Sequence, residues 1–360
     1  MGGSKNNAIE RAEMNKPRIG IVGLGWMGRW HAHNIMKDGR VELSDVCDSS
    51  SESIELLRTE TGFDGATHSD LPSLLSADID AVVIASPNAL HADMTVAAAR
   101  EGKHIYLEKP MAISVEDCRR SREAVNTSGV KFLSGYHRRL NPLYQHAKAL
   151  VADDKLGDLF MIESDYIHHV PGDWDIWSWL GKESVAGSIY HAGSGHNVDL
   201  IRYFCGDIIE VSCMKGTFLP RTDQVETEDT AIALYRFESG AIGKVQCCVG
   251  PITPFQFNFR LYGTKGTVLN NRVWLDTIPD FAEPGHEDDC EILPREWIPD
   301  NVQGGVSETW GKLMAHFVDM LVDDVPCLND VESTYKTSIA CFAALEAART
   351  GQVINVKAME

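Results

Sequence analysis

Short apolar runs alternate with helix-like stretches through the first third of the chain. Residues 81–85 are continuously apolar, as expected for a strand that is covered on both faces. Strand and helix signals that alternate in this way predict a doubly wound parallel sheet of the α/β class. The predicted strands are residues 18–22, 41–47, 81–85 and 103–107, and the predicted helices between them include residues 52–61 and 92–101.

From about residue 137 the pattern changes to that of an α+β domain, with a wide run of strand signals. Residues 189–205 read as a helix punctuated by glycines and closed by Gly206. Within residues 230–238 the alternation of apolar and polar positions is imperfect, which indicates that a partner subunit covers one face. We therefore expect a homo-oligomer that forms through this sheet. The other predicted elements are helices at 142–151, 308–323 and 331–350, and strands at 159–168, 208–218, 230–238, 241–249 and 255–262.

The first predicted strand leads directly into a Gly-x-Gly-x-x-Gly pattern and then into a helix. Gly23 permits the tight turn, Gly25 lets the backbone approach a pyrophosphate, and Gly28 allows close packing of helix on strand. The second strand ends at Asp48, where an acid suits the two hydroxyls of an adenosine ribose and repels the extra phosphate of NADP. The sequence therefore predicts an NAD site rather than a plain strand-to-helix turn. The cofactor residues assigned to this part are Gly23, Gly25, Trp26, Met27, Gly28 and Asp48.

Composition and charge exclude several classes of partner. Lys and Arg number 33 against 52 Asp and Glu, and the net charge of −19 opposes binding to nucleic acid or to an anionic membrane. Nine cysteines without a Cys-x-x-Cys pair are typical of a reducing compartment rather than of a disulfide framework. No apolar run reaches membrane-spanning length and no signal peptide precedes the first strand, so we expect a cytoplasmic protein.

Polar residues follow two neighbouring strands of the predicted sheet. The strand at 81–85 leads into Ser86, Asn88 and His91, at the edge where open α/β sheets bind ligands. The strand at 103–107 delivers Glu108-Lys109-Pro110, and the proline biases Lys109 away from helical angles. We expect all of these side chains except the proline at the cofactor site, with Lys109 beside the nicotinamide.

At this point the sequence resembles the Gfo/Idh/MocA oxidoreductases, named after glucose–fructose oxidoreductase and inositol dehydrogenase. The matching motifs, in family order, are Gly23 to Gly28, Ser86 to His91, Gly102 to Pro110, Gly135 to Pro142 and Leu261 to Gly266. The resemblance implies an N-terminal Rossmann domain and a C-terminal α+β domain with a large, mostly antiparallel open sheet. It also implies that Lys109 contacts the reacting hydroxyl and the nicotinamide ribose, and it adds Tyr136 and Arg138 as candidate substrate contacts.

The glycine-punctuated helix carries the candidate base. The family pattern is an acid, three residues, a histidine, two residues and an aspartate; His196 and Asp199 match its end, whereas Ala192 replaces its acid. We assign His196 as the proton acceptor. Asp199, at (i, i+3), either orients His196 or is structural, and with His191 it is a tentative substrate contact.

Zinc is the competing interpretation for the histidines at 168, 169, 191 and 196 with the aspartates at 173 and 175. No interval among these residues has a recognised ligand spacing, so we predict no metal.

The substrate prediction rests on an aromatic segment before the helix. Trp174, Trp177 and Trp179 stand within six residues, mixed with Asp173 and other polar groups. Indole faces beside hydrogen-bonding groups suit a pyranose ring, although a local aromatic core is the simpler alternative. We take Asp173, Trp174 and Trp177 as tentative substrate contacts.

The domains and the reaction follow. Residues 1–15 are predicted to be a flexible tail, 16–136 an NAD-binding Rossmann domain, and 137–360 a substrate-binding and oligomerisation domain. We expect oxidation of a secondary ring hydroxyl of a sugar or glycoside, first at C3, to a keto sugar, with hydride transfer to NAD from the carbon that bears this hydroxyl. The alternatives are an inositol or sugar dehydrogenase with free NAD exchange, an NAD-dependent glycosidase that acts by transient oxidation and elimination, and a non-catalytic sugar or NAD sensor, which the intact Lys109 disfavours.

Overall fold

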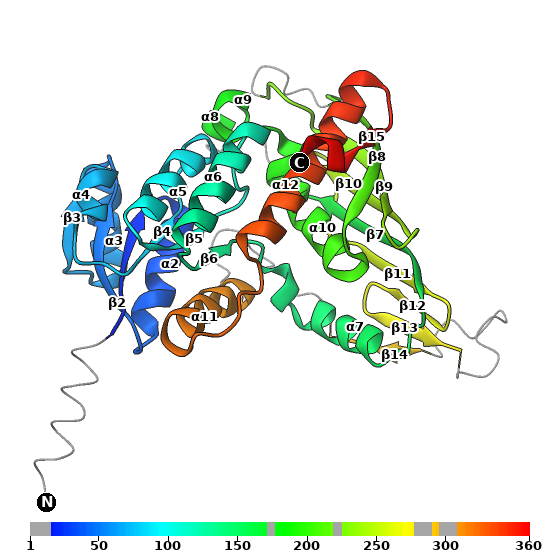
Figure 1. Ribbon diagram of the computed structural model, residues 1–360, viewed down its shortest axis with the longest axis horizontal. Helices are drawn as coiled ribbons and strands as arrows, with labels where there is room; N and C mark the ends of the chain where they lie inside the picture. Colours follow the sequence, from blue (N-terminus) through cyan, green and yellow to red (C-terminus); the bar gives the residue numbers. More distant parts are fainter. Residues whose placement is uncertain (1–15, 171–176, 219–224, 277–289, 295–307) are drawn as a thin grey trace, which may run out of the picture. The chain divides into compact units, whose positions relative to one another are not determined.

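The computed structural model describes residues 16–170, 177–218, 225–276, 290–294 and 308–360 (Figure 1). The chain forms two compact units. One contains residues 1–111, 119–135 and 310–331, and the other contains residues 112–118, 136–309 and 332–360. The predicted N-terminal tail lies outside the described residues.

The first unit is built on a parallel sheet in the order β3-β2-β1-β4-β5-β6. Ile19, Ile21 and Val82 to Ile84 have no exposed surface, which confirms the sheet covered on both faces. Its strands are β1 (Arg18–Val22), β2 (Glu42–Cys47), β3 (Ala66–His68), β4 (Ala81–Ile84), β5 (His104–Leu107) and β6 (Phe132–Ser134).

Helices flank these strands (Figure 1). Ser50 and Asp70 each accept a hydrogen bond from the backbone N–H three residues on, which fixes where α3 and α4 begin. Gly62 ends α3 in the left-handed conformation, at φ 73°. The helical segments are α2 (Trp26–Lys37), α3 (Ser51–Thr61), α4 (Leu71–Leu75), η1 (Asn88–Leu90), α5 (His91–Arg100) and α6 (Val115–Ser128).

Helix α11 (Glu308–Asp323) belongs to this unit from Trp310 onward, although it follows the second sheet in sequence. The ring of Trp310 lies 5.1 Å from that of Trp26, and the ring of Phe317 lies 5.7 Å from that of Tyr106. The division therefore differs from the sequence-based boundary at 136/137, because residues 310–331 group with the first unit and 112–118 with the second.

The second unit contains a nine-stranded sheet in the described residues, in the order β14-β13-β12-β11-β7-β10-β9-β8-β15. Strands β10 and β7 pair in parallel, and the other pairs are antiparallel. The strands are β7 (Leu159–Ile167), β8 (Ile208–Gly216), β9 (Thr230–Phe237), β10 (Ile242–Cys248), β11 (Phe259–Gly263), β12 (Gly266–Leu269), β13 (Arg272–Leu275), β14 (Glu291–Ile292) and β15 (Ile354–Asn355).

Helices α10 and α12 lie along one face of this sheet (Figure 1). Helix α10 is buried without interruption from Ile189 to Ile201. Opposite, β9 alternates strictly in burial, and its outward residues include the exposed Ile232 and Leu234. The helical segments are η2 (His137–Leu140), α7 (Pro142–Ala152), α8 (Trp177–Leu180), α9 (Glu183–Ala186), α10 (Ile189–Cys205), α12 (Val331–Thr350) and η3 (Val356–Met359).

Candidate functional site

The turn between β1 and α2 has room for a ligand at one glycine and none at the others. A Cβ atom on Gly28 would stand 1.8 Å from the Gly23 carbonyl oxygen, and one on Gly23, at φ +90°, would stand 2.6 Å from the Ala85 oxygen. A Cβ atom on Gly25 would meet nothing within 4 Å. Gly25 is also the N-cap of α2, and the first turn of α2 contains no acid. The turn therefore fits the pyrophosphate of NAD, which the open backbone and the positive helix end would hold.

Asp48 stands directly after β2 and is fixed to the same turn. Its Oδ2 atom accepts a hydrogen bond from the backbone N–H of Leu24 at 2.7 Å, and its Oδ1 atom accepts one from Ser50 at 2.8 Å. A carboxylate oxygen can accept more than one hydrogen bond, so both remain able to accept from ribose hydroxyls. The geometry fits the predicted role of Asp48.

His91 joins the segments that follow β4 and β5. Its ring nitrogens contact two carbonyl oxygens, that of Pro110 at 2.7 Å and that of Ser86 at 2.9 Å. Burial lowers the pKa of His91, although the two carbonyl oxygens oppose this effect. These contacts join the segment after β4 to the Lys109–Pro110 segment. Asn88, in the first of these segments, is also buried.

Glu108 and Lys109 form a charged pair at the end of β5. Glu108 Oε1 lies 2.8 Å from His31 Nε2, and Glu108 Oε2 accepts from the backbone N–H of Lys109 at 3.2 Å. Burial alone would raise the pKa of Glu108, but the hydrogen bond and charge of His31, together with Lys109, leave this pKa lowered. Burial lowers the pKa of Lys109, and the charge of Glu108 opposes that shift. His31, on α2, was missed by the sequence analysis because its partner is 77 residues away.

In the second unit, α10 holds His196 between aromatic rings. Ser188 caps the helix by accepting from the backbone N–H of His191. The ring of His196, which is 7% exposed, lies 5.6 Å from that of Tyr136 and 4.8 Å from that of His137. A Cβ atom on Gly195 would stand 3.0 Å from the Tyr136 hydroxyl oxygen, so this close approach favours glycine. His137 was not among the site residues predicted from the sequence.

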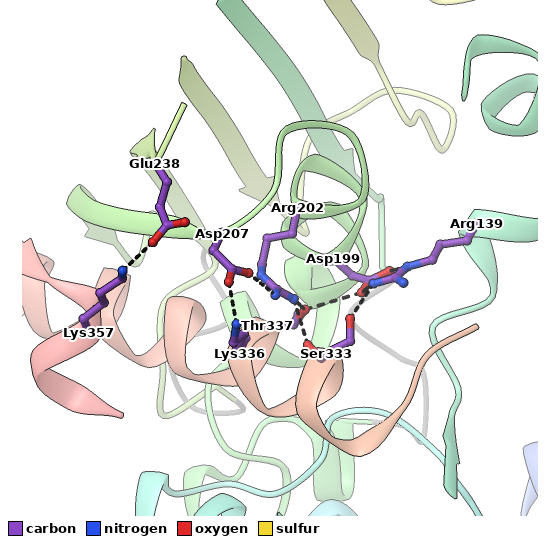
Figure 2. Close-up of polar contacts among 9 residues, drawn as sticks. All are labelled: Arg139, Asp199, Arg202, Asp207, Glu238, Ser333, Lys336, Thr337 and Lys357. Carbon is purple, nitrogen blue, oxygen red and sulfur yellow. Dashed lines mark hydrogen bonds and ion pairs between the residues drawn. The ribbon is translucent and has the colours of Figure 1, made fainter. Parts of the chain in front are cut away.

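Asp199 has a partner other than His196. Its Oδ2 atom accepts from Arg139 Nε at 2.9 Å, and Oδ1 contacts the same guanidinium group and lies 3.4 Å from the Thr337 hydroxyl oxygen. Arg139 also donates to the Ser333 hydroxyl at 2.9 Å (Figure 2). This network ties η2 to α10 and α12. It favours the structural alternative for Asp199, because both carboxylate oxygens are engaged there.

Other predicted substrate residues are buried in the second unit. His191 packs on α12, with Nε2 3.3 Å from the Ser338 hydroxyl and its ring 4.7 Å from Phe342. The guanidinium of Arg138 lies over the Phe257 ring at 3.9 Å. Trp177 is 4% exposed and Tyr136 is 1% exposed, which favours a local aromatic core for Trp177. Asp173 and Trp174 lie outside the described residues.

A half-buried aromatic group lies at the end of β7 and packs against α10. Ring centroids are separated by 4.2 Å between His168 and Phe255, and by 4.5 Å between Phe255 and Phe257. Tyr166 joins the group, 5.5 Å from Phe257, and its ring fills the space that a Cβ atom on Gly193 of α10 would need. Phe255 and Phe257 carry no motif, so sequence reasoning had no signal for them.

The described residues contain no group of three or more His, Cys, Asp or Glu side chains that could hold a metal ion. The zinc interpretation involves Asp173 and Asp175, which lie outside that part of the chain.

Two models of one family match successive parts of the chain. The oxidoreductase family with an NAD-binding Rossmann fold matches residues 17–136, and the GFO/IDH/MocA C-terminal domain matches residues 144–269. Together they cover about two thirds of the chain. The protein belongs to the Gfo/Idh/MocA family.

Individual members of the Gfo/Idh/MocA family are similar over most of their length. The scyllo-inositol 2-dehydrogenase (NAD(+)) of Bacillus subtilis is 26% identical over 94% of this chain and 96% of its own. The levoglucosan dehydrogenase of Pseudarthrobacter phenanthrenivorans is 26% identical over 72% and 74%, respectively. The WlbA dehydrogenase from Bordetella pertussis, solved with NADH and UDP-GlcNAcA, has a TM-score of 0.80 and is 26% identical, covering 95% of this chain and 99% of its own.

These findings confirm the predicted family, the fold class and the NAD cofactor. They also confirm an NAD-dependent oxidoreductase that acts on CH–OH groups. In the part of the chain that the structure describes, no helix is both long and apolar enough to cross a membrane.

Proposed function

We propose that this Gfo/Idh/MocA protein oxidises a secondary ring hydroxyl of a sugar or glycoside, with C3 as the first candidate position, to give a keto sugar. The observation that carries the proposal is the half-buried Lys109, next to the His31–Glu108 pair at the end of β5. A lysine at that strand end is suited to hold a substrate oxygen, rather than to serve only as a solvent-exposed surface charge. Relatives that act on inositol and on levoglucosan support a cyclic polyol or sugar as the substrate class.

NAD, when bound, supplies the hydride acceptor. Gly25 and the first turn of α2 would hold its pyrophosphate, and Asp48 would bind the adenosine ribose. Trp26 and Met27, with Ser86, Asn88 and His91 after β4, complete the proposed cofactor residues.

Lys109 donates a hydrogen bond to the reacting oxygen and stabilises the negative charge that develops there. Burial lowers the pKa of Lys109, and the charge of Glu108 opposes this shift and so favours the ammonium form that this role needs. His196 accepts the hydroxyl proton. We keep Tyr136, Arg138, Asp173, Trp174, Trp177, His191 and Asp199 only as positions to test for effects on substrate binding.

Substrate screening with NAD tests the proposal directly. Free sugars, aryl glycosides and inositols are incubated with protein and NAD, and absorbance at the nicotinamide band is followed together with the identity of the product. Formation of a keto sugar supports the proposal. Turnover of inositols alone establishes the second candidate, an inositol dehydrogenase, which the similarity to the Bacillus subtilis enzyme favours.

We also propose that the protein is a homo-oligomer that uses the outer face of the large sheet. Met214 on β8 stands opposite Ile232 on β9, and these side chains are 83% and 44% exposed. Leu234 and Ile242 extend the apolar surface, at 56% and 48% exposed. A second copy of the same sheet face would cover these side chains.

A further inference from the structure

His31 on α2 contacts the chain segment that leads to Lys109 at two points. Its ring lies 4.7 Å from the ring of Tyr106 on β5, and its Nε2 atom lies 2.8 Å from Glu108 Oε1. The ring of Phe317 on α11 lies 5.7 Å from that of Tyr106, and His31 has no exposed surface. The imidazole is therefore held in one place by packing, independently of its contact with Glu108.

The carboxylate of Glu108 is enclosed on three sides. A carboxylate only accepts hydrogen bonds, so His31 carries a proton on Nε2 and donates to Oε1. The other oxygen, Oε2, accepts from the backbone N–H of Lys109 at 3.2 Å. A Cβ atom on Gly135 would stand 2.9 Å from this same Oε2 atom, so a larger residue there would displace the carboxylate. These contacts fix the backbone at Lys109, and with it the direction in which the lysine side chain leaves the chain.

His31 also keeps this carboxylate charged. Burial raises the pKa of Glu108, but the hydrogen bond and charge of His31, followed by the effects of Lys109, leave the pKa lowered. An ionised oxygen is a stronger acceptor than a neutral one, so the N–H of Lys109 is held best while Glu108 is charged.

The ionisable groups around Glu108 add no competing charge near neutral pH. Burial raises the pKa of Tyr106 and lowers that of His91, and both shifts favour the neutral form. Strand β6 (Phe132–Ser134) carries no ionisable side chain. The remaining ionisable side chains of α2 and α5 are exposed or, in one case, paired with Glu60: His33, Lys37, Asp93, Arg100 and the paired Arg29.

We propose that His31 is a positioning residue for the reaction: through the ionised carboxylate of Glu108 it fixes the backbone of Lys109, and so directs the lysine ammonium group toward the reacting oxygen. The inference rests on the proposed role of Lys109 in alcohol oxidation. His31 neither gains nor loses a proton in this role. Without its donor, Glu108 stays buried with one hydrogen bond fewer, so it takes up a proton more readily and holds the Lys109 N–H less firmly.

Nuclear magnetic resonance tests the pair without a substrate. The protein is labelled with isotope-enriched lysine, and the backbone N–H signal of Lys109 is assigned by its loss in Lys109→Met. The signal is then titrated with pH in the wild type, in His31→Leu, which removes the donor, and in His31→Gln, which keeps an N–H donor. We expect the midpoint of the titration to rise by about one unit or more in His31→Leu and to stay near the wild-type value in His31→Gln.

The matched control is a second imidazole–carboxylate pair in the same unit. His68 Nε2 on β3 lies 2.8 Å from Asp45 Oδ1 on β2, the same separation as in the pair of His31 with Glu108. His68→Leu should therefore lower the free energy of unfolding but leave the Lys109 signal and kcat unchanged.

Kinetics with a substrate from the screen measure the effect on the reaction. His31→Leu should lower kcat roughly 10- to 100-fold, and more at about pH 6 than at about pH 8, because protonation of Glu108 weakens its hold on the Lys109 N–H. The KM for the substrate and the NAD dissociation constant should stay within a few-fold. His31→Gln should retain most of the wild-type kcat.

Gly135→Ala disturbs the same carboxylate from the other side and serves if His31→Leu does not fold. Its Cβ atom displaces the end of the Glu108 side chain, so kcat should fall although His31 is intact. An unchanged Lys109 signal and kcat in these variants overturns the positioning role, and so does an equal loss of kcat in His31→Gln, His31→Leu and His68→Leu. Full turnover in Lys109→Met instead removes the lysine from the proposed function, whatever the titration shows.

Discussion

The backbone N–H of Leu24 donates a 2.7 Å hydrogen bond to Asp48 Oδ2, which joins the glycine-rich turn to the end of β2. The same carboxylate therefore holds the turn, and we propose that it also binds the adenosine ribose. We predict that Asp48→Ala raises the KM for NAD by roughly 10-fold and leaves the KM for NADP unchanged or lower, because ribose contacts are lost and repulsion of the 2′-phosphate ends.

Steady-state kinetics with both cofactors measure this effect. Asp64→Ala, at an exposed loop position of the same unit, is the control and should leave both constants unchanged. A wild type that is saturated equally well by NADP, or an alanine variant with the wild-type ratio of the two constants, contradicts the role of Asp48.

Replacement of Lys109 separates chemistry from cofactor binding. Lys109→Met should lower kcat by roughly 10²- to 10⁴-fold, because the donor to the reacting oxygen is lost, while the NAD dissociation constant stays within a few-fold. Stopped-flow turnover and NADH fluorescence titration measure the two quantities. The exposed Lys155→Met is the control for loss of one positive charge. Retained turnover in Lys109→Met removes this residue from the mechanism.

The parts of the site that the sequence predicted are those that local chain geometry determines. Gly23, Gly25 and Gly28 follow a buried strand, and Asp48 and Lys109 stand at strand ends, so a parallel sheet brings them to one edge. The fold class follows from the same alternation of strands and helices.

The parts that were missed depend on contacts between distant residues. His31 contacts Glu108, 77 residues away in the sequence, and Asp199 contacts Arg139, 60 residues away. The (i, i+3) spacing between His196 and Asp199 therefore gave no sign that Arg139 is the partner of Asp199. Helix α11 joins the first unit through side-chain packing, which no local signal encodes. The apolar Ile232 and Leu234 made the pattern of β9 imperfect, although its burial alternates strictly.

The outer face of the large sheet gives a prediction about assembly. Ile232→Lys combined with Leu234→Lys should reduce the oligomer to a smaller species, since two desolvated charges would face the partner subunit. Sedimentation velocity measures the mass in solution. Leu56→Lys, which also replaces a half-exposed leucine but lies on α3, should leave the mass unchanged. A double variant with the wild-type mass shows that assembly does not use this face.

His91 gives a prediction about stability against pH. Burial lowers its pKa in the folded protein, so below the unfolded value of about 6.5 the unfolded chain binds a proton that the folded chain does not. The free energy of unfolding should therefore fall as pH drops from 7.5, and this contribution should level off below the folded pKa. Urea unfolding at a series of pH values measures the slope.

His91→Asn should be less stable at pH 7.5, because the contacts to Pro110 and Ser86 are disturbed, but its stability should fall less steeply with pH. The remaining slope reflects groups such as His104 and His316, whose pKa values burial also lowers. Equal slopes in the two proteins would assign the pH dependence to these other groups and not to His91.

The final prediction distinguishes two aromatic groups that could face the substrate. Trp177 is 4% exposed, so Trp177→Ala should lower the free energy of unfolding by about 3–5 kcal/mol through lost packing. Phe255 is half-buried beside His168 and Phe257, in the group that reaches α10 through Tyr166. If this group packs against a sugar ring, Phe255→Leu should raise the KM for the sugar roughly 3- to 10-fold at nearly constant kcat and NAD affinity. Kinetics and urea unfolding on both variants decide between the two groups. A raised KM for the sugar in a folded Trp177→Ala protein, together with an unchanged KM in Phe255→Leu, would place the substrate against the tryptophan segment instead.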